Sequence, residues 1–356
     1  SWQMFGLKSA GDADGITMSG VTQTGELDIS AVTYANIYNT NVGNQDSDVR
    51  GVRFNNDGTK MFVMGNSNDE VFEYNLSSAV GGTPYQVNTA TYQNISFVLN
   101  GPTNCLDVLF NNDGTKMYVP SSSPSPSRVY EYNLTTPFSL ATGNVSASNT
   151  LDISGVGGSS SCHGITFNND GTKFYVAISS SSVFQYTLTT AFDLSTASYA
   201  NKYFAANSQV SDISGVNFNS DGTSMYISDN GADDIFQYNL TTAYDVSTAS
   251  YANKFLAITQ DNLNSNGEIE GFCFADNFSR MYVVGAVYDQ VIQFNTAFTE
   301  SITQPTQQYH VGVTNTSGRI DSSSFTDINS MTAAQNAGTG TVHYAVSTDG
   351  RTTWSV

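Results

Sequence analysis

The chain has 356 residues, of which 12% are charged and 12% aromatic, and its formal net charge is −19, from 12 Lys and Arg against 31 Asp and Glu. A chain of this length and aromatic content can bury a substantial core, which excludes an intrinsically disordered protein. The acidic excess argues against binding to nucleic acid or to an anionic membrane surface. No stretch has the roughly 20 continuous apolar residues that a membrane-spanning helix needs.

Residues 2–38 read as an incomplete copy of a unit that the chain then repeats in full. Residues 28–38 (DISAVTYANIY) match residues 193–203 (DLSTASYANKY) position by position, and residues 2–7 and 15–21 align with the second and third strands of later units. The inner strand of this first unit has no counterpart. Either it lies upstream in a longer protein, or a later segment closes the structure.

Five full units follow, each marked by a ten-residue motif that opens on a Phe. The copies are FNNDGTKMFV at Phe54, FNNDGTKMYV at Phe110, FNNDGTKFYV at Phe167, FNSDGTSMYI at Phe218 and FADNFSRMYV at Phe274. They recur at intervals of 51 to 57 residues. A nearly fixed period of this size indicates stacked supersecondary units.

Each unit predicts four antiparallel strands. A short apolar strand ends at the Phe, and an Asp-Gly turn follows, because Gly supplies a positive φ without steric cost. A second strand such as KMYV leads through a polar loop to a third such as VFQYTL, and the connection TTAFDLSTA reaches a fourth, SYANKYF. Such units are typical of propeller blades. We therefore predict an all-β fold, a β-propeller with six four-stranded blades, or seven if more sequence precedes residue 1.

Two positions of the inner strand have a structural interpretation. Five residues before the Phe, Cys105 and Cys162 replace the aliphatic residues of other copies, so we expect buried thiols that act as small hydrophobes. Three residues before the Phe, four copies have Gly and one has Asp107. Gly at this point suits a crowded approach of the inner strands to a central axis.

After about residue 295 the repeat fades. Residues 307–314 (QQYHVGVT) can supply the fourth strand of the last blade, which gives a predicted propeller over residues 1–312. Residues 313–356 then read as the beginning of a second β-rich domain, truncated at the end of the sequence. It has an Asp-Gly turn between strand-like segments, and one short helix can form in DINSMTAAQNA.

Residues that could carry chemistry are few. His310 and His343 lack Cys or carboxylate neighbours at ligand spacing, and there is no nucleophile elbow or phosphate-binding loop. Other copies have residues of different types at the position of His163, so it is expected to face solvent or the channel rather than to bind a metal. Six residues before the Phe, Asp48, Asp212 and Glu268 begin inner strands, so they are predicted to ring one end of the central channel. There they could hold a hard cation such as Ca²⁺. The alternative is that polar residues simply begin strands at a wet surface. No other cofactor is expected.

The repeated motif resembles the YVTN and related propeller repeats, whose Ser-Pro-Asp-Gly-Lys turn is replaced here by Asn-Asn-Asp-Gly-Thr-Lys. The phrase DVSTASYA, residues 245–252, is similar to repeats in large surface and virion proteins of marine bacteria and their phages. There a propeller precedes a segment similar to residues 318–356. The resemblance covers residues 2–356 and implies the propeller fold, but its motifs carry no catalytic residue.

The resemblance and the loops together predict a non-enzymatic structural and recognition module of a phage tail fibre or similar virion appendage. The loops between second and third strands differ from blade to blade, as in GNSNDE, SSSPSPSR, ISSSS and DNGADD. Such loops on a constant scaffold suit binding to a host-surface glycan or protein. We expect a virion or extracellular location, a homo-oligomer with other virion or surface proteins, and neither nucleic acid nor membrane insertion.

Two other functions remain open. One is a bacterial extracellular adhesin or surface filament subunit with the same architecture. The other is a propeller lyase or hydrolase that uses a metal in the channel, and the missing His cluster counts against it.

Overall fold

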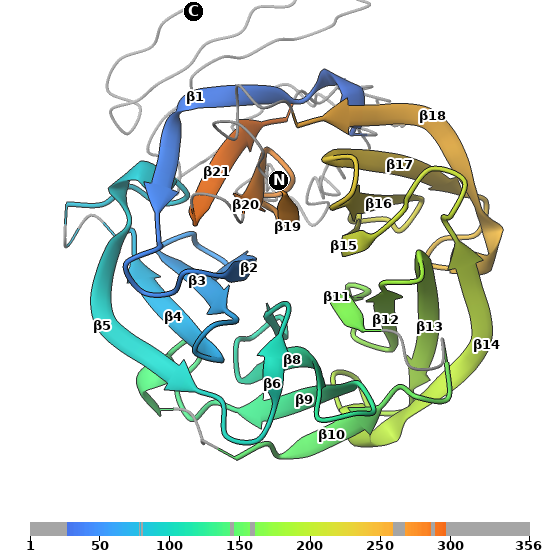
Figure 1. Cartoon of the computed structure of the whole chain (residues 1–356), viewed down its shortest axis with the longest axis horizontal. Helices are drawn as coiled ribbons and strands as arrows, with labels where there is room; N and C mark the ends of the chain where they lie inside the picture. Colours follow the sequence, from blue (N-terminus) through green and yellow to red (C-terminus); the bar gives the residue numbers. More distant parts are fainter. Residues whose placement is uncertain are drawn as a thin grey trace, which may run out of the picture. The chain divides into compact units, whose positions relative to one another are not determined.

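The computed structural model describes residues 27–77, 79, 81–142, 146–156, 161–258, 268–285 and 289–296, all within the compact unit Gly25–Ser301. Five antiparallel sheets follow one another around a central axis (Figure 1). The described residues contain no α-helix. The all-β propeller is thereby confirmed. The expectations for residues 2–21 and 307–356, including the second domain and its short helix, lie outside the described residues.

Each blade runs from an inner strand to an outer strand. Blade 1 contains β2 (Val49–Phe54), β3 (Lys60–Gly65), β4 (Glu70–Asn75) and β5 (Thr91–Val98). Blade 2 contains β6 (Thr103–Cys105), β7 (Leu109–Phe110), β8 (Lys116–Ser123), β9 (Arg128–Asn133) and β10 (Asn149–Asp152), and both β6 and β7 pair with β8. Blade 3 contains β11 (Cys162–Phe167), β12 (Lys173–Ile178), β13 (Ser182–Leu188) and β14 (Ala197–Ala205). Blade 4 contains β15 (Ile213–Phe218), β16 (Ser224–Asp229), β17 (Asp234–Leu240) and β18 (Ala249–Ala257).

Blade 5 is assembled from both ends of the described chain. It contains β19 (Ile269–Ala275), β20 (Arg280–Gly285), β21 (Gln290–Asn295) and, as its outer strand, β1 (Thr33–Asn41). A 3₁₀ turn precedes the outer strand of every blade: η1 (Ile29–Ala31), η3 (Val87–Thr89), η4 (Leu140–Thr142), η5 (Leu194–Thr196) and η6 (Val246–Thr248).

The predicted count of six or seven blades is wrong, because the incomplete first unit is not a blade of its own. β1 pairs antiparallel with β21, from Thr33 opposite Asn295 to Asn41 opposite Gln290. An unpaired β21 would leave its backbone groups open to pairing with another chain, and β1 covers that edge. The fourth strand of the last blade is β1, and residues 307–314, which were expected to supply it, lie outside the described residues.

The hairpin after each inner strand forms as predicted. Gly58, Gly114, Gly171 and Gly222 have φ between 67° and 73°. In blade 1 the Asp57 carboxylate accepts hydrogen bonds from the amide and hydroxyl of Thr59, at 3.0 and 2.6 Å. The same bonds recur in blades 2, 3 and 4. Asp and Thr are therefore repeated because they hold the turn.

An aromatic ring covers each of these four turns. The amide of Tyr244 donates to the carbonyl of Gly222 at 2.9 Å, and a Cβ added to Gly222 would lie 2.2 Å from the Tyr244 ring. The rings that cover the other three turns belong to Tyr85, Phe138 and Phe192. Only glycine leaves room for the ring, so the Asp-Gly pair is required by packing as well as by φ.

Other residues of the motif join neighbouring blades. The Tyr118 hydroxyl donates to the carbonyl of Phe192 at 2.6 Å, and the Asn112 side chain donates to the carbonyl of Asn169 at 2.7 Å. Equivalent Tyr bonds connect blades 3 and 4 and blades 5 and 1. The motif recurs because each copy makes both its own turn and a contact with the next blade.

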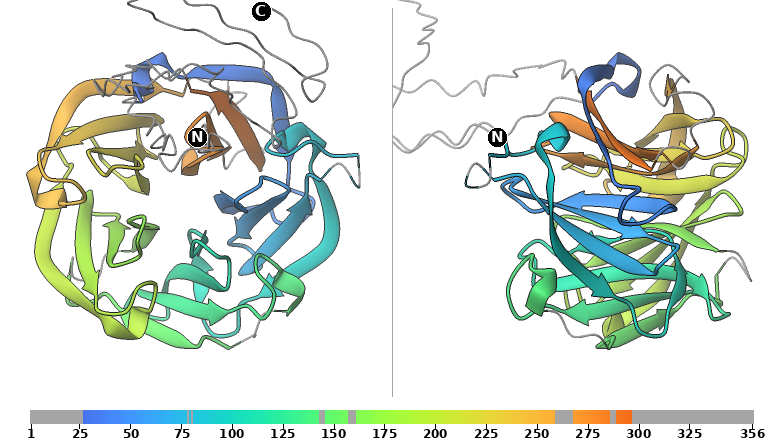
Figure 2. Two further views of the ribbon diagram at one scale, coloured as in Figure 1. Left: turned by 180° about the vertical axis from the view of Figure 1, so that it is seen from behind. Right: turned by 60° about the vertical axis from the view of Figure 1, so that its left-hand side comes forward.

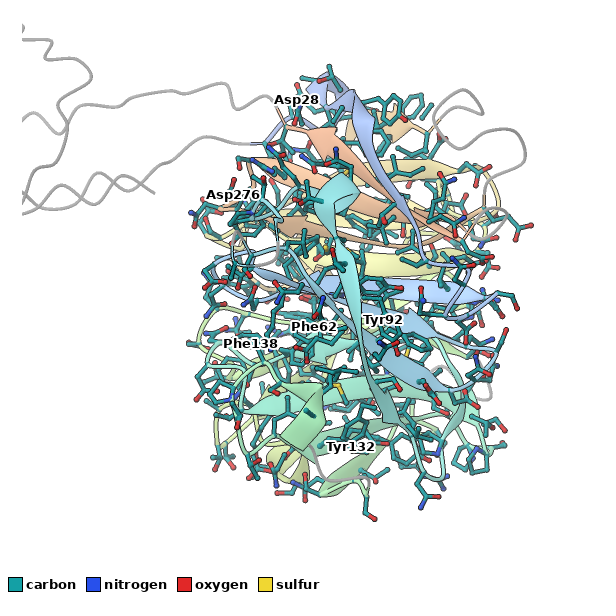
Figure 3. The ribbon with its side chains drawn as sticks, turned by 90° about the vertical axis from the view of Figure 1, so that its left-hand side faces the viewer. Asp28, Phe62, Tyr92, Tyr132, Phe138 and Asp276 are labelled. Atoms are coloured by element: carbon teal, nitrogen blue, oxygen red, sulfur yellow. The ribbon has the colours of Figure 1, made fainter. Side chains whose placement is uncertain are left out.

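The core lies in the seams between blades. At the seam of blades 1 and 2, Phe62 packs with Phe110 at a ring-centroid distance of 4.5 Å and with Phe138 at 6.5 Å (Figure 3). Cys105 and Cys162 are buried and free, which confirms the prediction of small hydrophobes. In the described part of the chain, no helical segment has the length and apolarity needed to cross a membrane.

The inner strands meet closely at the axis. A Cβ on Gly164 would lie 2.8 Å from Cα of Gly215 in the next blade, and a Cβ on Gly271 would lie 2.4 Å from the carbonyl oxygen of Arg50. Real side chains essentially never approach backbone so closely. The interpretation of these glycines as a response to crowding is confirmed.

Candidate functional site: the variable face and the channel

The ring has two faces: one is formed by loops of repeated sequence, and the other by loops of variable sequence. The repeat face contains the hairpin turns between first and second strands together with the connections from third to fourth strands. Tyr85, Phe138, Phe192 and Tyr244 tie the two sets together through their amides. Asp28, Asp276 and Phe138, which belong to these segments, lie toward the same end of the blades in Figure 3. This face is built from the repeated motif.

The variable face is the opposite end of the blades, where strands reverse through loops whose sequences differ more than those of the repeat face (Figure 2). It contains the loops between second and third strands and those from one blade to the next. Two recurring bonds tie the two sets. The amides of Asn66, Ser179 and Asn230 donate to the carbonyls of Asp48, Ser161 and Asp212, at 2.8 to 2.9 Å. The amides of Val42, Leu99, Ala206 and Ile258 donate to the carbonyls of Asp289, Asp69, Ser181 and Asp233, at 2.7 to 3.0 Å. The described residues of this face are 42–48, 66–69, 99–102, 124–127, 153–156, 161, 179–181, 206–212, 230–233, 258, 268 and 289.

Carboxylates on the two faces differ in how well their charged forms are stabilised. On the repeat face, hydrogen bonds from Thr59 hold the pKa of Asp57 below its ordinary value. On the variable face, burial and the neighbouring carboxylates of Asp229 and Asp233 raise the pKa of Asp234 to about 6. Burial also raises the pKa of Asp69, Asp233 and Asp289. The variable face therefore holds half-buried acids whose charged forms are poorly stabilised.

The three residues predicted to form a cation ring lie at the strand starts on the variable face, in blades 1, 4 and 5. The Asp48 carboxylate is already engaged by Arg50, whose Nε lies at 2.7 Å, and by the Asn66 side chain at 2.7 Å. Asp212 lies 3.8 Å from Nδ1 of His163. In the described chain no group of three or more His, Cys, Asp or Glu is arranged to hold a metal ion. The ring of Asp48, Asp212 and Glu268 stays a prediction.

The channel mouth is a network of internally paired polar groups. Arg50 also contacts the Glu270 carboxylate of blade 5, so its guanidinium joins two blades. His163 lies with Nδ1 2.7 Å from the carbonyl oxygen of Ile213 in blade 4. Burial lowers the pKa of His163, which therefore favours the neutral imidazole near neutral pH. These groups have their partners within the protein, and the chemistry they offer a ligand is limited.

Deeper along the axis, the Arg53 side chain joins four of the five blades. Its Nη2 lies 2.9 Å from the Asp107 carboxylate of blade 2, and Nη1 donates to its own neighbour Val52 in blade 1. Longer bonds, at 3.4 and 3.5 Å, reach the carbonyls of Phe272 in blade 5 and Ile165 in blade 3. The side chains of Arg53 and Asp107 are 11% and 8% exposed, so this pair is largely buried near the axis.

Sequence analysis did not single out Arg53 as a functional or structural residue. One signal was present, since Asp107 stands where the other four copies have Gly. An acidic residue at a crowded, buried position requires a cationic partner. Its partner is 54 residues away in the previous blade, and only the closed ring brings the two together.

The described chain enters and leaves the ring at the repeat face of blade 5. Leu27 to Val32 precede β1 and contain η1, the same 3₁₀ turn that joins the third and fourth strands of other blades. Thr296 follows β21, beside the start of β1. Both connections thus occur on the face opposite the variable loops.

The chain matches no known family model and no curated protein. Similar solved structures include a protein of Bacteroides uniformis ATCC 8492 and one of Bacteroides fragilis NCTC 9343, both provisionally described as 6-phosphogluconolactonases, with TM-scores of 0.41 and 0.42 at 11% and 12% identity. Another is a functionally unknown protein from Desulfotomaculum acetoxidans DSM 771, with a TM-score of 0.40 at 12% identity. The matches cover 59%, 59% and 66% of this chain but only 55%, 55% and 62% of those chains. At these values the likenesses carry no argument about activity.

Proposed function

We propose that this propeller is a non-enzymatic structural and recognition module of a phage tail fibre or similar virion appendage, and that its variable face binds the host surface. The observation that carries the proposal is the division of the ring into a repeat face, where the motif residues bond to one another, and a face whose loops differ in sequence from blade to blade. Loops on a rigid scaffold can change without disturbing the core, which suits a binding surface.

The positions of the chain connections support the same function. The polypeptide enters at Leu27 and leaves at Thr296, both on the repeat face of blade 5. The variable face is therefore opposite the points through which the ring is joined to the rest of its chain. A recognition module in a larger homo-oligomeric assembly needs its binding loops on such a face. The virion setting itself rests on the resemblance of the repeats.

Location and binding can be tested with an antibody against the chain and with the purified protein. We expect the antibody to detect the chain in purified virions, and the labelled protein to adhere to host cells. Detection on uninfected cells, with none in virions, would favour the adhesin or surface filament. A tightly bound metal ion in stoichiometric amount would favour the lyase or hydrolase.

A further inference from the structure

The exposed part of the variable face has a narrow chemical character. Apart from glycines, the exposed residues of its described loops are Ser and Asn, with Pro124, Ala232 and Glu268 as the exceptions. The Ser and Asn include Asn44, Ser67, Asn68, Ser125, Ser180 and Asn207. None of the described loop residues is Phe, Tyr, Trp, Met, Arg or Lys. The described part of this surface therefore consists mostly of neutral donors and acceptors.

Such a surface does not fit a protein partner. Protein interfaces are enriched in aromatic residues, Met and Arg and depleted in Ser and Asp, and their strongest contacts come from Trp, Tyr and Arg. The apolar residues of these loops, such as Val42, Val210 and Ile153, are buried and hold the loops to the core. The exposed large apolar side chains of the described residues, Val98, Tyr203 and Phe255, lie on the outer strands β5, β14 and β18. The described loops themselves therefore have no hydrophobic anchor with which to dock a folded protein.

The described polar groups of the channel are not free to bind a small molecule either. Arg53 and Asp107 are buried and paired with each other near the axis, and Arg50 at the mouth is held by Asp48 and Glu270. A ligand must therefore lie across the loops of several blades and bind by hydrogen bonds. A polymer of hydroxyl-bearing units meets both conditions, because each hydroxyl is a donor and an acceptor like the Ser and Asn side chains that face it.

We propose that the variable face binds a polysaccharide across the loops of several blades. This inference rests on the proposed function, which it narrows from glycan or protein to glycan. The acidic groups of the described face, such as Asp69, Asp234 and the exposed Glu268, give it a negative charge. Neutral polysaccharides are accordingly better ligands than strongly anionic ones.

A matched pair of cysteine variants tests the inference on the full chain. Ala232 and Ala243 are both exposed alanines of blade 4, the first on the variable face and the second on the repeat face. Ala232→Cys and Ala243→Cys can each be coupled to maleimide-polyethylene glycol after folding. The native Cys105, Cys162 and Cys273 are buried, so only the introduced thiol reacts.

The probes are purified capsular polysaccharides and lipopolysaccharides immobilised beside the protein fraction of the same cell envelopes. We expect the polymer on Ala232→Cys to weaken polysaccharide binding by about tenfold or more, and the polymer on Ala243→Cys to change it less than about twofold. Uncoupled variants should bind like wild type. Periodate oxidation of the sugar diols should abolish binding.

The outcomes separate the two claims. The propeller could instead bind only to the immobilised protein fraction, with binding blocked by the polymer on Ala232→Cys and unaffected by periodate. That result would overturn the polysaccharide inference but would still support a recognition module. The inference would also be overturned if the polymer on Ala243→Cys blocked polysaccharide binding and the polymer on Ala232→Cys did not. Retention by neither probe would count against the proposed function itself.

Discussion

At the residue scale, one guanidinium at the axis carries an unusual share of the contacts between blades. Arg53 bonds to groups of blades 1, 2, 3 and 5, and blade 4 joins the same region through the Asn217 side chain, which donates to the Phe272 carbonyl at 3.1 Å. A buried ion pair contributes little beyond its desolvation cost, but removing one partner leaves the other charge buried and unpaired. The Arg53 contacts therefore matter most when one of them is lost.

Arg53→Ala is expected to lower the free energy of unfolding by about 3 to 5 kcal/mol, because it leaves Asp107 charged and buried. Arg128→Ala is the control, since the Arg128–Asp152 pair is partly exposed with its charged atoms 3.8 Å apart. That change should cost no more than about 0.5 kcal/mol. Urea unfolding of the two variants measures the difference. A loss of the same size in both would refute the assigned role of Arg53.

The thiols provide a second prediction at this scale. Burial raises the pKa of Cys273 to about 12 and also raises the pKa of Cys105 and Cys162. Since the thiolate is the reactive form, a disulfide reagent should modify no cysteine in the native protein and three after denaturation. Rapid reaction of one thiol at neutral pH in the native state would contradict this burial.

At the scale of the elements, the hairpin turn and the aromatic ring above it form one unit. In blades 1 to 4 the ring lies against the turn glycine, and the ring-bearing residue has a positive φ of its own, between 51° and 62°. The turn glycine and the ring-bearing residue, both with positive φ, thus stabilise each other through their contact and the hydrogen bond between them. The turn and the third-to-fourth connection should form or melt together.

Gly222→Ala should destabilise the protein by about 2 to 4 kcal/mol, from the left-handed backbone together with the clash against the Tyr244 ring. Gly81→Ala separates the two effects, because Gly81 has φ 81° but nothing within 4 Å of its added Cβ. Its cost should be about 1 kcal/mol, from the backbone alone. Thermal or urea unfolding gives both values. Equal losses of stability in the two variants would mean that the Tyr244 side chain moves aside without cost.

The hairpin between β16 and β17 predicts a pH effect. Asp229 and Asp234 lie directly opposite each other at its end, and burial raises the pKa of Asp234 to about 6, above the ordinary value of 3.8. The folded state therefore binds this proton more tightly than the unfolded state. The resulting stabilisation is complete below pH 3.8 and is lost as the pH rises through 6.

Asp234→Asn should thus stabilise the protein at pH 7.5 by about 1 kcal/mol after allowance for solvent screening, and the advantage should shrink toward pH 5. Asp221→Asn on the repeat face is the contrasting change. The Asp221 carboxylate accepts bonds from Thr223, so its loss should destabilise at both pH values. Urea unfolding at the two pH values checks both variants. A stability gain for Asp234→Asn that is the same at both pH values would contradict the raised pKa of Asp234.

At the scale of the whole molecule, closure of the ring depends on one strand. β1 is the outer strand of blade 5, and its 3₁₀ turn is tied to blade 4 through Asp28, whose carboxylate lies 3.1 Å from Nζ of Lys254. The amide of Ile29 also donates to the Gln237 side chain at 3.0 Å. The segment thus joins the first and last parts of the repeat array.

A chain that begins at residue 42 should lose the cooperative unfolding of the intact protein, because the edge of β21 and the seam with blade 4 are both exposed. A synthetic peptide of residues 27–41, added in trans, should restore the transition, while a scrambled peptide should not. Calorimetry and size-exclusion chromatography report the result. Unchanged stability of the shortened chain would show that β1 is dispensable for closure.

The sequence by itself determined the blade and its hairpin. Gly222 and Asp221 act within a turn of a few residues, and this turn is repeated with nearly the same sequence in four blades. The buried cysteines and the crowded inner-strand glycines could be predicted for the same reason, since alignment of the copies shows what each position tolerates. The ring of Asp48, Asp212 and Glu268 could be placed at the strand starts, but its proposed cation remains a prediction.

Only the tertiary structure decided how many blades there are and what fills the axis. The pairing of Thr33 with Asn295, which gives five blades, and the pairing of Arg53 with Asp107 join residues from different units. The division into a repeat face and a variable face likewise requires the blades to be closed into a ring. A repeat specifies its own unit through local bonds, whereas these features depend on which distant units are brought into contact when the ring closes.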